Sequence, residues 1–515
     1  MNGAESLVRT LVAGGVDTCF ANPGTSEMHF VAALDRVDGM RCVLVLFEGI
    51  ATGAADGYAR MADKPAATLL HLGPGLANGL ANLHNATKAS TPIVNIVGDH
   101  ATYHRSYDAP LTSDIEGAAA PFSGWVHTSP DATRVAADGA AAITAARTAP
   151  GRVATLILPA DTAWNEGSGP VAVAEAPKRT RVSQDCIEDT AKALRSGEPT
   201  MMLLGGLGLR ECGLDLAGRI CAKTGAKIMS QTFPGRIERG AGRVAVDRLP
   251  YPVNQARASL AGLKHIVLVG SRIPVAFFAY PDKPSLMASE DTEFLTLARS
   301  EEDVLDALER LANELDAQSF PSQAAKLALP SLATGTITGA NISQSLSALI
   351  PENAIVVDES ISASASFFAA SWNSQPHTYL QNMGGSIGLG MPMATGAAIA
   401  CPNRPVLNLQ ADGSSMYAIQ SLWTQVREGL NITTVLFNNK SYACLRDELA
   451  NVGAQNVGRK ALDMLDLSRP DIDFAGLARS MGMAAARVTT MEEFNVVVAR
   501  GLSTPGPCLI EVQIT

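Results

Sequence analysis

The sequence predicts an α/β protein built from three doubly wound, parallel-sheet domains. Short apolar runs alternate with longer stretches of helical periodicity along the whole chain, which is typical of βαβ units. The 515 residues suffice for about three domains, and the 47% that are apolar provide a core for each. Two stretches rich in Pro and small polar residues interrupt the alternation, and they divide the chain into residues 1–162, 185–317 and 340–515.

Composition excludes several classes of partner. The 50 acidic and 40 basic residues give a net charge of −10 without any Lys/Arg cluster, so we expect no nucleic-acid or membrane partner and a small-molecule substrate. No apolar run reaches the length of a membrane span, and the first residues lack a secretory signal, which favours a cytoplasmic protein. The eight cysteines form no C-x-x-C pair, which disfavours a zinc site and a disulfide framework.

The first third of the chain contains four apolar runs that we interpret as strands. They lie at residues 41–47, 66–72, 92–98 and 153–160. The first run ends at Glu48, which opens a helical stretch rich in Gly and Ala. An acid at this place is either a first-turn residue stabilised by the helix dipole or a group that shares a proton with a bound molecule.

The middle third has two comparable runs, at residues 201–206 and 265–271. The segment GGLGLRE (205–211) follows the first of them, but Glu211 replaces the third glycine of a dinucleotide-binding fingerprint. We therefore predict a plain strand-to-helix turn. Without a dinucleotide motif, the sequence disfavours FAD as a cofactor.

The last third carries the strongest local signal. A strand at 405–410 leads through the turn ADGSS into a helical stretch, and a second strand at 432–437 leads into NNKSY. A crossover of this length is right-handed and sets the two strands parallel, so Asp412 and Asn439 emerge at the same edge of the sheet. Asp and Asn are also ordinary turn formers after strands, which is the alternative interpretation.

Asp412 and Asn439 suit a hard cation that is bound together with a phosphate group. Mg²⁺ takes about six oxygen ligands, which a carboxylate, an amide oxygen and a loop carbonyl can begin to provide. The backbone amides of Gly413 and Ser414, at a helix start, favour the negative charge of a phosphate.

Two segments carry a resemblance to a known family. The 27-residue spacing of Asp412 and Asn439 resembles the thiamine diphosphate motif, a GDG followed by a double Asn, with Ala411 in place of the first glycine. The segment EGIATGAADGYAR, which begins at Glu48, resembles the catalytic-glutamate segment of the thiamine-diphosphate-dependent family that contains acetolactate synthase, pyruvate oxidase and benzoylformate decarboxylase. The similarity covers nearly the whole chain, and it extends to an acetolactate synthase-like group in actinobacteria.

The resemblance implies a cofactor set and an assembly. The cofactors are thiamine diphosphate and Mg²⁺. Residues 1–162 match the pyrimidine-binding domain, 185–317 the central domain and 340–515 the diphosphate-binding domain. The family's active sites lie between subunits, which implies a homodimer or homotetramer.

The family's metal and proton-transfer residues carry over to matching positions. Glu48 matches the acid that activates the cofactor at its pyrimidine ring. Asp412 and Asn439 match the metal ligands, and Ser441 matches the residue whose carbonyl completes them.

Three further positions match cofactor contacts. Ser362 matches a diphosphate contact, Gly385 the carbonyl that faces the aminopyrimidine, and Ile387 the bulky residue that props the cofactor into its bent shape. The alternative for Gly385 and Ile387 is a glycine-rich helix start packed against a sheet.

The substrate side resembles benzoylformate decarboxylase most. Thr25, in the segment NPGTSE, matches the hydroxyl that holds the substrate carboxylate. His71 lies 23 residues after Glu48 and matches an imidazole that transfers protons, although a single His after a strand also fits a structural role. The second histidine of that decarboxylase falls in residues 271–282, where this chain has Phe277, Phe278 and Ala279.

The resemblance therefore implies an enzyme that acts on 2-oxo acids by decarboxylation, carboligation or both. Two alternatives remain. The chain could be a catalytically weak, thiamine-diphosphate-binding partner subunit of an active homologue. It could also be a 2-hydroxyacyl-CoA lyase, which would need a basic pocket for the CoA phosphates.

Overall fold

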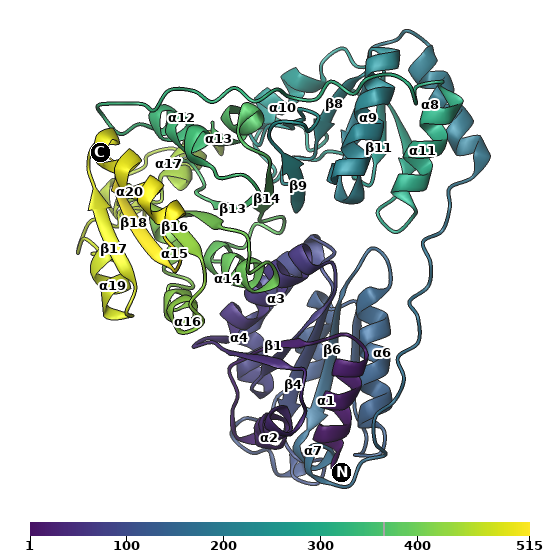
Figure 1. Cartoon of the computed structure of the whole chain (residues 1–515), viewed down its shortest axis with the longest axis vertical. Helices are drawn as coiled ribbons and strands as arrows, with labels where there is room; N and C mark the ends of the chain where they lie inside the picture. Colours follow the sequence, from purple (N-terminus) through teal and green to yellow (C-terminus); the bar gives the residue numbers. More distant parts are fainter. Residues whose placement is uncertain (364–365, 515) are drawn as a thin grey trace.

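The computed structural model describes residues 1–363 and 366–514, and it contains three β-sheets with helices on both faces. The N-terminal part lies at the bottom of Figure 1, the central part at the upper right and the C-terminal part at the upper left. The prediction of three parallel-sheet α/β domains is confirmed. The boundaries 1–162, 185–317 and 340–515 stay a prediction. Among the described residues, no helix is both long and apolar enough to cross a membrane.

The first sheet has six parallel strands in the order β2-β1-β3-β4-β6-β5. Side chains alternate between its faces, so Leu69 packs toward α1, α2 and α6, whereas Leu70 packs toward α3, α4 and α5. The strands are β1 (Thr18–Ala21), β2 (Arg41–Leu44), β3 (Ala66–Leu70), β4 (Ile93–Asp99), β5 (Trp125–Thr128) and β6 (Val153–Pro159). The helices are α1 (Gly3–Ala13), α2 (Met28–Arg36), α3 (Glu48–Ala62), α4 (Leu72–Lys88), α5 (Ile115–Ala119), α6 (Val135–Arg147) and α7 (Ala160–Trp164).

The central sheet has five parallel strands in the order β10-β8-β7-β11-β12. As predicted, GGLGLRE forms a tight turn between β7 and α9, with a 3-10 helix at Gly206–Leu209. The strands are β7 (Thr200–Leu204), β8 (Lys227–Ser230), β10 (Asp247–Arg248), β11 (His265–Val269) and β12 (Glu293–Ala298). The helices are α8 (Gln184–Arg195), α9 (Glu211–Thr224), α10 (Val253–Leu260) and α11 (Val304–Glu314).

The third sheet has seven strands in the order β17-β18-β16-β15-β13-β14-β9. Its edge strand β9 (Arg236–Arg239) comes from the central part of the chain and pairs antiparallel with β14, which the sequence did not predict. The other strands are β13 (Ala354–Glu359), β14 (His377–Gln381), β15 (Val406–Ala411), β16 (Ile432–Asn438), β17 (Ala484–Val488) and β18 (Cys508–Gln513).

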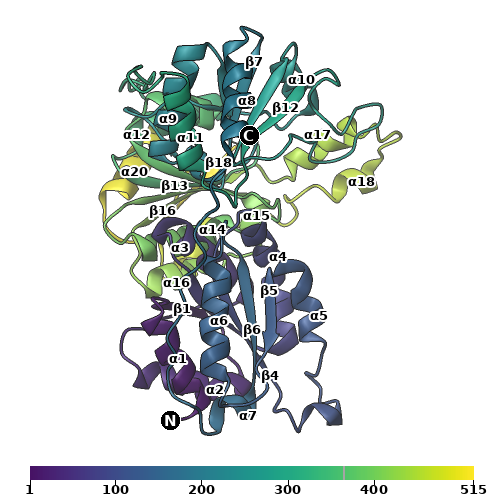
Figure 2. The ribbon, with the colours of Figure 1, turned by 90° about the vertical axis from the view of Figure 1, so that its right-hand side faces the viewer.

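Helices cover both faces of the third sheet, and two further helices project away from it at one side of the molecule. Figure 2 shows α17 and α18 projecting there, and neither helix has a buried residue. The helices are α12 (Gly339–Leu349), α13 (Phe367–Ala370), α14 (Gly390–Ala400), α15 (Asp412–Ser415), α16 (Ser421–Arg427), α17 (Ala443–Asn451), α18 (Arg459–Asp463), α19 (Phe474–Ser480) and α20 (Met491–Ser503).

Helices α3 and α14 join the first and third sheets through one continuous apolar core. Their backbones approach closely, because a Cβ atom on Gly57 would clash with the carbonyl oxygen of Met393, and one on Gly396 would clash with that of Ala54. Leu389, just before α14, lies within van der Waals reach of Gly53 in α3. The contact therefore sets the glycine-rich segment before α14 against the helix that begins at Glu48.

Candidate active site

Glu48 is the first residue of α3 and is buried, with 6% of its surface exposed. Strand β2 ends at Leu44, so the predicted strand up to residue 47 is too long. One carboxylate oxygen of Glu48 accepts a hydrogen bond from Nδ2 of Asn78 in α4 at 2.9 Å. A Cβ atom on Gly75 would lie 3.0 Å from the other oxygen. Helix α4 thus fixes the carboxylate and leaves little room around it.

Thr25 and His71 lie in a second cluster, together with Glu27, which was not among the predicted site residues. Thr25 is exposed and begins a 3-10 turn, and a Cβ atom on the preceding Gly24 would clash with the imidazole of His71. Nδ1 of His71 lies 2.8 Å from Oε2 of Glu27, whose side chain is fully buried, and the Gly24 amide donates to the same oxygen at 2.7 Å.

The Glu27 carboxylate determines which nitrogen of His71 carries the proton. An ionised carboxylate only accepts hydrogen bonds, so Nδ1 of His71 donates and Nε2 remains for other partners. The sequence offered one signal for Glu27, its position three residues after Gly24. The structure adds a second, Gly98, where a Cβ atom would clash with the Glu27 carboxylate. Neither signal identifies His71 as its partner.

Asp412 and Asn439 meet at the carboxyl ends of neighbouring strands, as the sequence predicted. Strands β15 and β16 pair in parallel, with Ala411 opposite Phe437. Oδ2 of Asp412 accepts the backbone amides of Asn439 at 3.0 Å and Lys440 at 2.7 Å. Burial raises the pKa of Asp412, while these backbone amides act in the opposite direction.

The turn after β15 differs in one respect from the prediction. The Gly413 amide, expected to face a phosphate, donates to Oδ1 of Asp412 at 2.7 Å. Ser414 is buried, and its hydroxyl donates to the carbonyl of Ala411 at 3.2 Å. A Cβ atom on Gly413 would clash with the ring of Tyr442, so the turn accommodates only glycine at this position.

The donor atoms near Asp412 are oxygens, which suits Mg²⁺. Three amides occupy part of the lone-pair capacity of the carboxylate, which has about four sites in all. Oδ1 of Asn439 accepts the Ser441 amide at 3.0 Å and retains a second lone pair. Within residues 1–363 and 366–514, no group of three or more His, Cys, Asp or Glu side chains is arranged to hold a metal ion. A cation here would therefore be bound by a mixed set of oxygens from carboxylate, amide and carbonyl groups.

The segment before α14 is held by the N-terminal part of the chain. Asn85 of α4 accepts the Ser386 amide at 3.1 Å and donates to the Ser386 carbonyl at 2.8 Å. Gly385 has a φ of +80°, which favours glycine, and Ile387 is half-buried. Ser362 is exposed and follows β13, the neighbour of β15 in the sheet.

Phe277 and Phe278 lie in a cluster of four aromatic rings with Phe233 and Tyr251. The centroids of contacting rings are 4.9 to 6.1 Å apart. Phe277 is 41% exposed and Phe278 is 54% exposed, so neither is a core residue. A Cβ atom on Gly385 would lie 2.5 Å from Cζ of Phe277. The ring of Phe277 therefore lies against Gly385.

The predicted site residues form two groups in one chain. In the described ranges, no hydrogen bond or ion pair joins Glu48, Thr25 or His71 to Asp412 or Asn439. Helix α4 contacts both parts, because Asn78 binds Glu48 and Asn85 binds the segment before α14.

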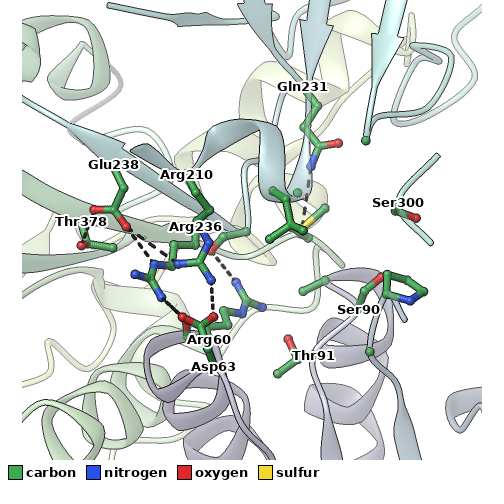
Figure 3. Close-up of a pocket in the computed structure, with 18 of the residues that line it drawn as sticks. Arg60, Asp63, Ser90, Thr91, Arg210, Gln231, Arg236, Glu238, Ser300 and Thr378 are labelled. Carbon is green, nitrogen blue, oxygen red and sulfur yellow. Dashed lines mark hydrogen bonds and ion pairs between the residues drawn. The ribbon is translucent and has the colours of Figure 1, made fainter. Parts of the chain in front are cut away.

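A large cleft between the three parts of the chain lies elsewhere. Its volume is about 1310 Å³, and none of the predicted site residues lines it. Basic side chains outnumber acidic ones in its lining, but the arginines labelled in Figure 3 have partners within the chain. Asp63 pairs with Arg210 and Arg236, and Arg236 also pairs with Glu238. This network connects the first sheet's helices to β9.

Comparisons with known proteins agree with the geometry. The model "Thiamine pyrophosphate enzyme, N-terminal TPP binding domain" matches residues 1–122, and the corresponding C-terminal TPP binding domain matches residues 362–512. The chain is 52% identical, over all 515 residues and 99% of the relative, to Mycobacterium tuberculosis IlvX, whose name assigns it provisionally to the acetolactate synthase large subunits. The chain belongs to the thiamine pyrophosphate enzyme family.

More distant relatives of this thiamine pyrophosphate enzyme include decarboxylases. Benzoylformate decarboxylase of Pseudomonas aeruginosa is 26% identical over 535 aligned residues, which cover 97% of this chain and 96% of the relative. The solved structure of a thiamine diphosphate-dependent 4-hydroxybenzoylformate decarboxylase from Rhodococcus jostii RHA1 has the same fold, with a TM-score of 0.87 and 24% identity over 100% of this chain and 99% of that one. The cofactor of the present enzyme is thiamine diphosphate, the other name of thiamine pyrophosphate.

Proposed function

We propose that this enzyme binds thiamine diphosphate with Mg²⁺, releases CO₂ from a 2-oxo acid and joins the remaining acyl group to a second carbonyl compound. The observation that carries the proposal is the convergence of the Asp412 carboxylate with Asn439 at the ends of β15 and β16. When bound, thiamine diphosphate supplies a carbon nucleophile and an electron sink for the loss of CO₂.

The C-terminal residues hold the metal and the diphosphate. Asp412 and Asn439 provide side-chain oxygens to Mg²⁺, and Ser441 provides its carbonyl oxygen. The remaining contacts with the cofactor come from Ser362, Gly385, Ile387 and Ser414, whereas the Gly413 amide donates to Asp412.

The N-terminal residues transfer protons and hold the substrate. Glu48 holds a proton against a ring nitrogen of the cofactor, in a buried place that excludes water. Thr25 binds the substrate carboxylate through its exposed hydroxyl. His71 moves a proton through Nε2, because Glu27 occupies Nδ1.

Phe277 favours carboligation over simple decarboxylation. After CO₂ leaves, the acyl carbon is either protonated, which gives an aldehyde, or joined to a second carbonyl. The Phe277 ring, which lies against Gly385, has no proton to give. Without a proton donor at this position, protonation of the acyl carbon is slower and the second carbonyl has more time to react.

We also propose that two copies complete each site, in a homodimer or homotetramer. Within one chain no described hydrogen bond or ion pair joins Glu48 to Asp412 or Asn439, and a site shared between subunits would bring these groups to one cofactor. A cytoplasmic location is part of the same proposal.

A product screen tests the proposed function. Purified protein with thiamine diphosphate and Mg²⁺ is incubated with pyruvate or benzoylformate, with and without added aldehydes, and CO₂ release and hydroxyketone products are measured. We expect 2-oxo acid consumption with carboligation products. Full cofactor occupancy without any consumption would contradict the proposal and favour a partner-subunit role.

The metal assignment has its own test. Asp412→Ala removes the carboxylate, so we expect the Mg²⁺-dependent affinity for thiamine diphosphate in calorimetry to fall by more than about tenfold. Asp291→Ala, at an exposed position of the central part, is the control. Equal affinities in the two variants would discredit the assignment.

A further inference from the structure

Glu359 is a buried acid that no assigned role explains. It is the last residue of β13, only 3% of its surface is exposed, and in the described residues no Lys or Arg forms an ion pair with it. Its carboxylate instead accepts three consecutive backbone amides at the start of α14: Gly388 and Leu389 at 3.1 Å, and Gly390 at 3.0 Å.

A fourth hydrogen bond extends this arrangement to the next strand. Nε2 of Gln410 in β15 donates to Oε2 of Glu359 at 2.9 Å and to the hydroxyl of Ser414 at 2.6 Å. Glu359, Gln410 and Ser414 are all buried. The buried chain therefore runs from the segment before α14 to the turn that begins with Asp412.

The surroundings of Glu359 suit an ionised carboxylate. All four partners are donors, and α14 is eleven residues long, so the positive end of its dipole faces the acid. Burial raises the pKa of Glu359, whereas Gln410 and the three amides lower it. A Cβ atom on Gly390 would clash with the side chain of Gln410, so the chain leaves little room for an alternative arrangement.

We propose that Glu359 is a positioning residue, which through Gln410 and Ser414 fixes the Gly385–Ile387 segment relative to the Asp412 turn. The distance between these two segments, which form the two ends of the cofactor site in the C-terminal part, is then held constant. The consequence for cofactor binding rests on the proposed function, whereas the coupling itself concerns only this chain.

The test compares three variants. Glu359→Gln keeps the size of the side chain but turns an NH₂ group toward the donors. Gln410→Met removes the hydrogen bonds to Glu359 and to Ser414, and leaves the three backbone amides that Glu359 accepts. Asp138→Asn is the control, because Asp138 is an equally buried acid that binds Ser129 in the N-terminal part. Hydrogen exchange of peptides covering 383–393 and 411–420 is followed by mass spectrometry in cofactor-free protein, and thiamine diphosphate affinity is measured by calorimetry.

We expect Glu359→Gln to speed exchange in both peptides and to weaken cofactor binding by about tenfold, because it disrupts charge-assisted hydrogen bonds. Gln410→Met should speed exchange in 411–420 more than in 383–393, and it keeps the test valid if Glu359→Gln does not fold. Exchange in both variants equal to that of Asp138→Asn would overturn the proposal, as would faster exchange confined to 383–393. Failure of the proposed function differs, since wild-type protein would then consume no 2-oxo acid in the product screen, whereas the exchange data in cofactor-free protein decide the coupling by themselves.

Discussion

Glu48 is the residue whose chemistry can be isolated most cleanly. The Glu48→Gln variant retains a hydrogen-bond partner for Asn78 but cannot share an acidic proton. We expect the variant to retain part of its cofactor affinity and to lose hydrogen exchange at the thiazolium carbon, which NMR in deuterated buffer measures after acid quench. Glu5→Gln, on the surface of α1, is the matched control. Normal exchange in Glu48→Gln would refute the role.

Phe277 gives a second prediction for a single residue. A histidine in its place would bring a proton donor to the segment that contacts Gly385. The Phe277→His variant should therefore release more aldehyde and less hydroxyketone per 2-oxo acid consumed, by about tenfold in the product ratio. The control is Phe320→Ala, at a ring that contacts Lys223. An unchanged ratio would show that Phe277 does not control the fate of the acyl group.

The sequence identifies those site residues whose partners lie within the same strand-helix-strand unit. Asp412 and Asn439 were predictable because one strand-helix-strand unit separates them, and parallel pairing brings strand ends together. Glu27 was not predictable as the partner of His71, since the two residues are 44 positions apart and the packing of two strands and two helices between them decides the contact. Glu359 was missed because the sequence around an acid at the end of a strand is the same whether the carboxylate binds the start of a distant helix or is exposed to solvent.

At the scale of elements, the contact between α3 and α14 determines where two parts of the site lie. Gly396 has no space for a Cβ atom, which would clash with the backbone of Ala54. Gly396→Ala should therefore push the helices apart and lower the free energy of unfolding by about 1–3 kcal/mol, which urea titration measures. Gly458→Ala is the control, because no atom lies within 4 Å of a Cβ placed there. Equal destabilisation by both changes would contradict the close-contact argument.

Most strands were predictable because parallel strands covered on both faces are continuous apolar runs. Strand β9 was not, since its sequence RIER is charged and its place at the edge of the third sheet depends on contacts of Arg236 and Glu238 with distant residues. Strand β2 was predicted three residues too long. Val45 and Phe47 extend its apolar run and pack in the core on the α3 side, but they lie beyond the end of the strand, where the Val45 amide still donates to Ala21 of β1, at 3.0 Å.

At the scale of the whole molecule, a shared active site predicts complementation. Glu48→Gln and Asp412→Ala proteins are each expected to be inactive. If one subunit supplies Glu48 and the other Asp412, a hybrid dimer contains one intact site. Subunits mixed and reassembled at equal concentration should then regain about a quarter of wild-type activity, because half of the dimers are hybrids with one of two sites intact.

The control for complementation mixes two preparations that carry the same substitution, which should stay inactive. Mass spectrometry of differently tagged subunits establishes that hybrids form. Hybrids without any regained activity would place both groups of residues in one subunit's site.

The central proposal is that one thiamine diphosphate molecule is bound by Asp412 through Mg²⁺ and activated by Glu48. A crystal structure of the enzyme with thiamine diphosphate and Mg²⁺ tests this most directly. It should show Mg²⁺ bonded to oxygens of Asp412 and Asn439, and a Glu48 carboxylate within about 2.6–3.2 Å of a pyrimidine nitrogen of the same cofactor molecule. A cofactor bound away from Asp412, or with no Glu48 at its pyrimidine ring in any subunit, would contradict the account.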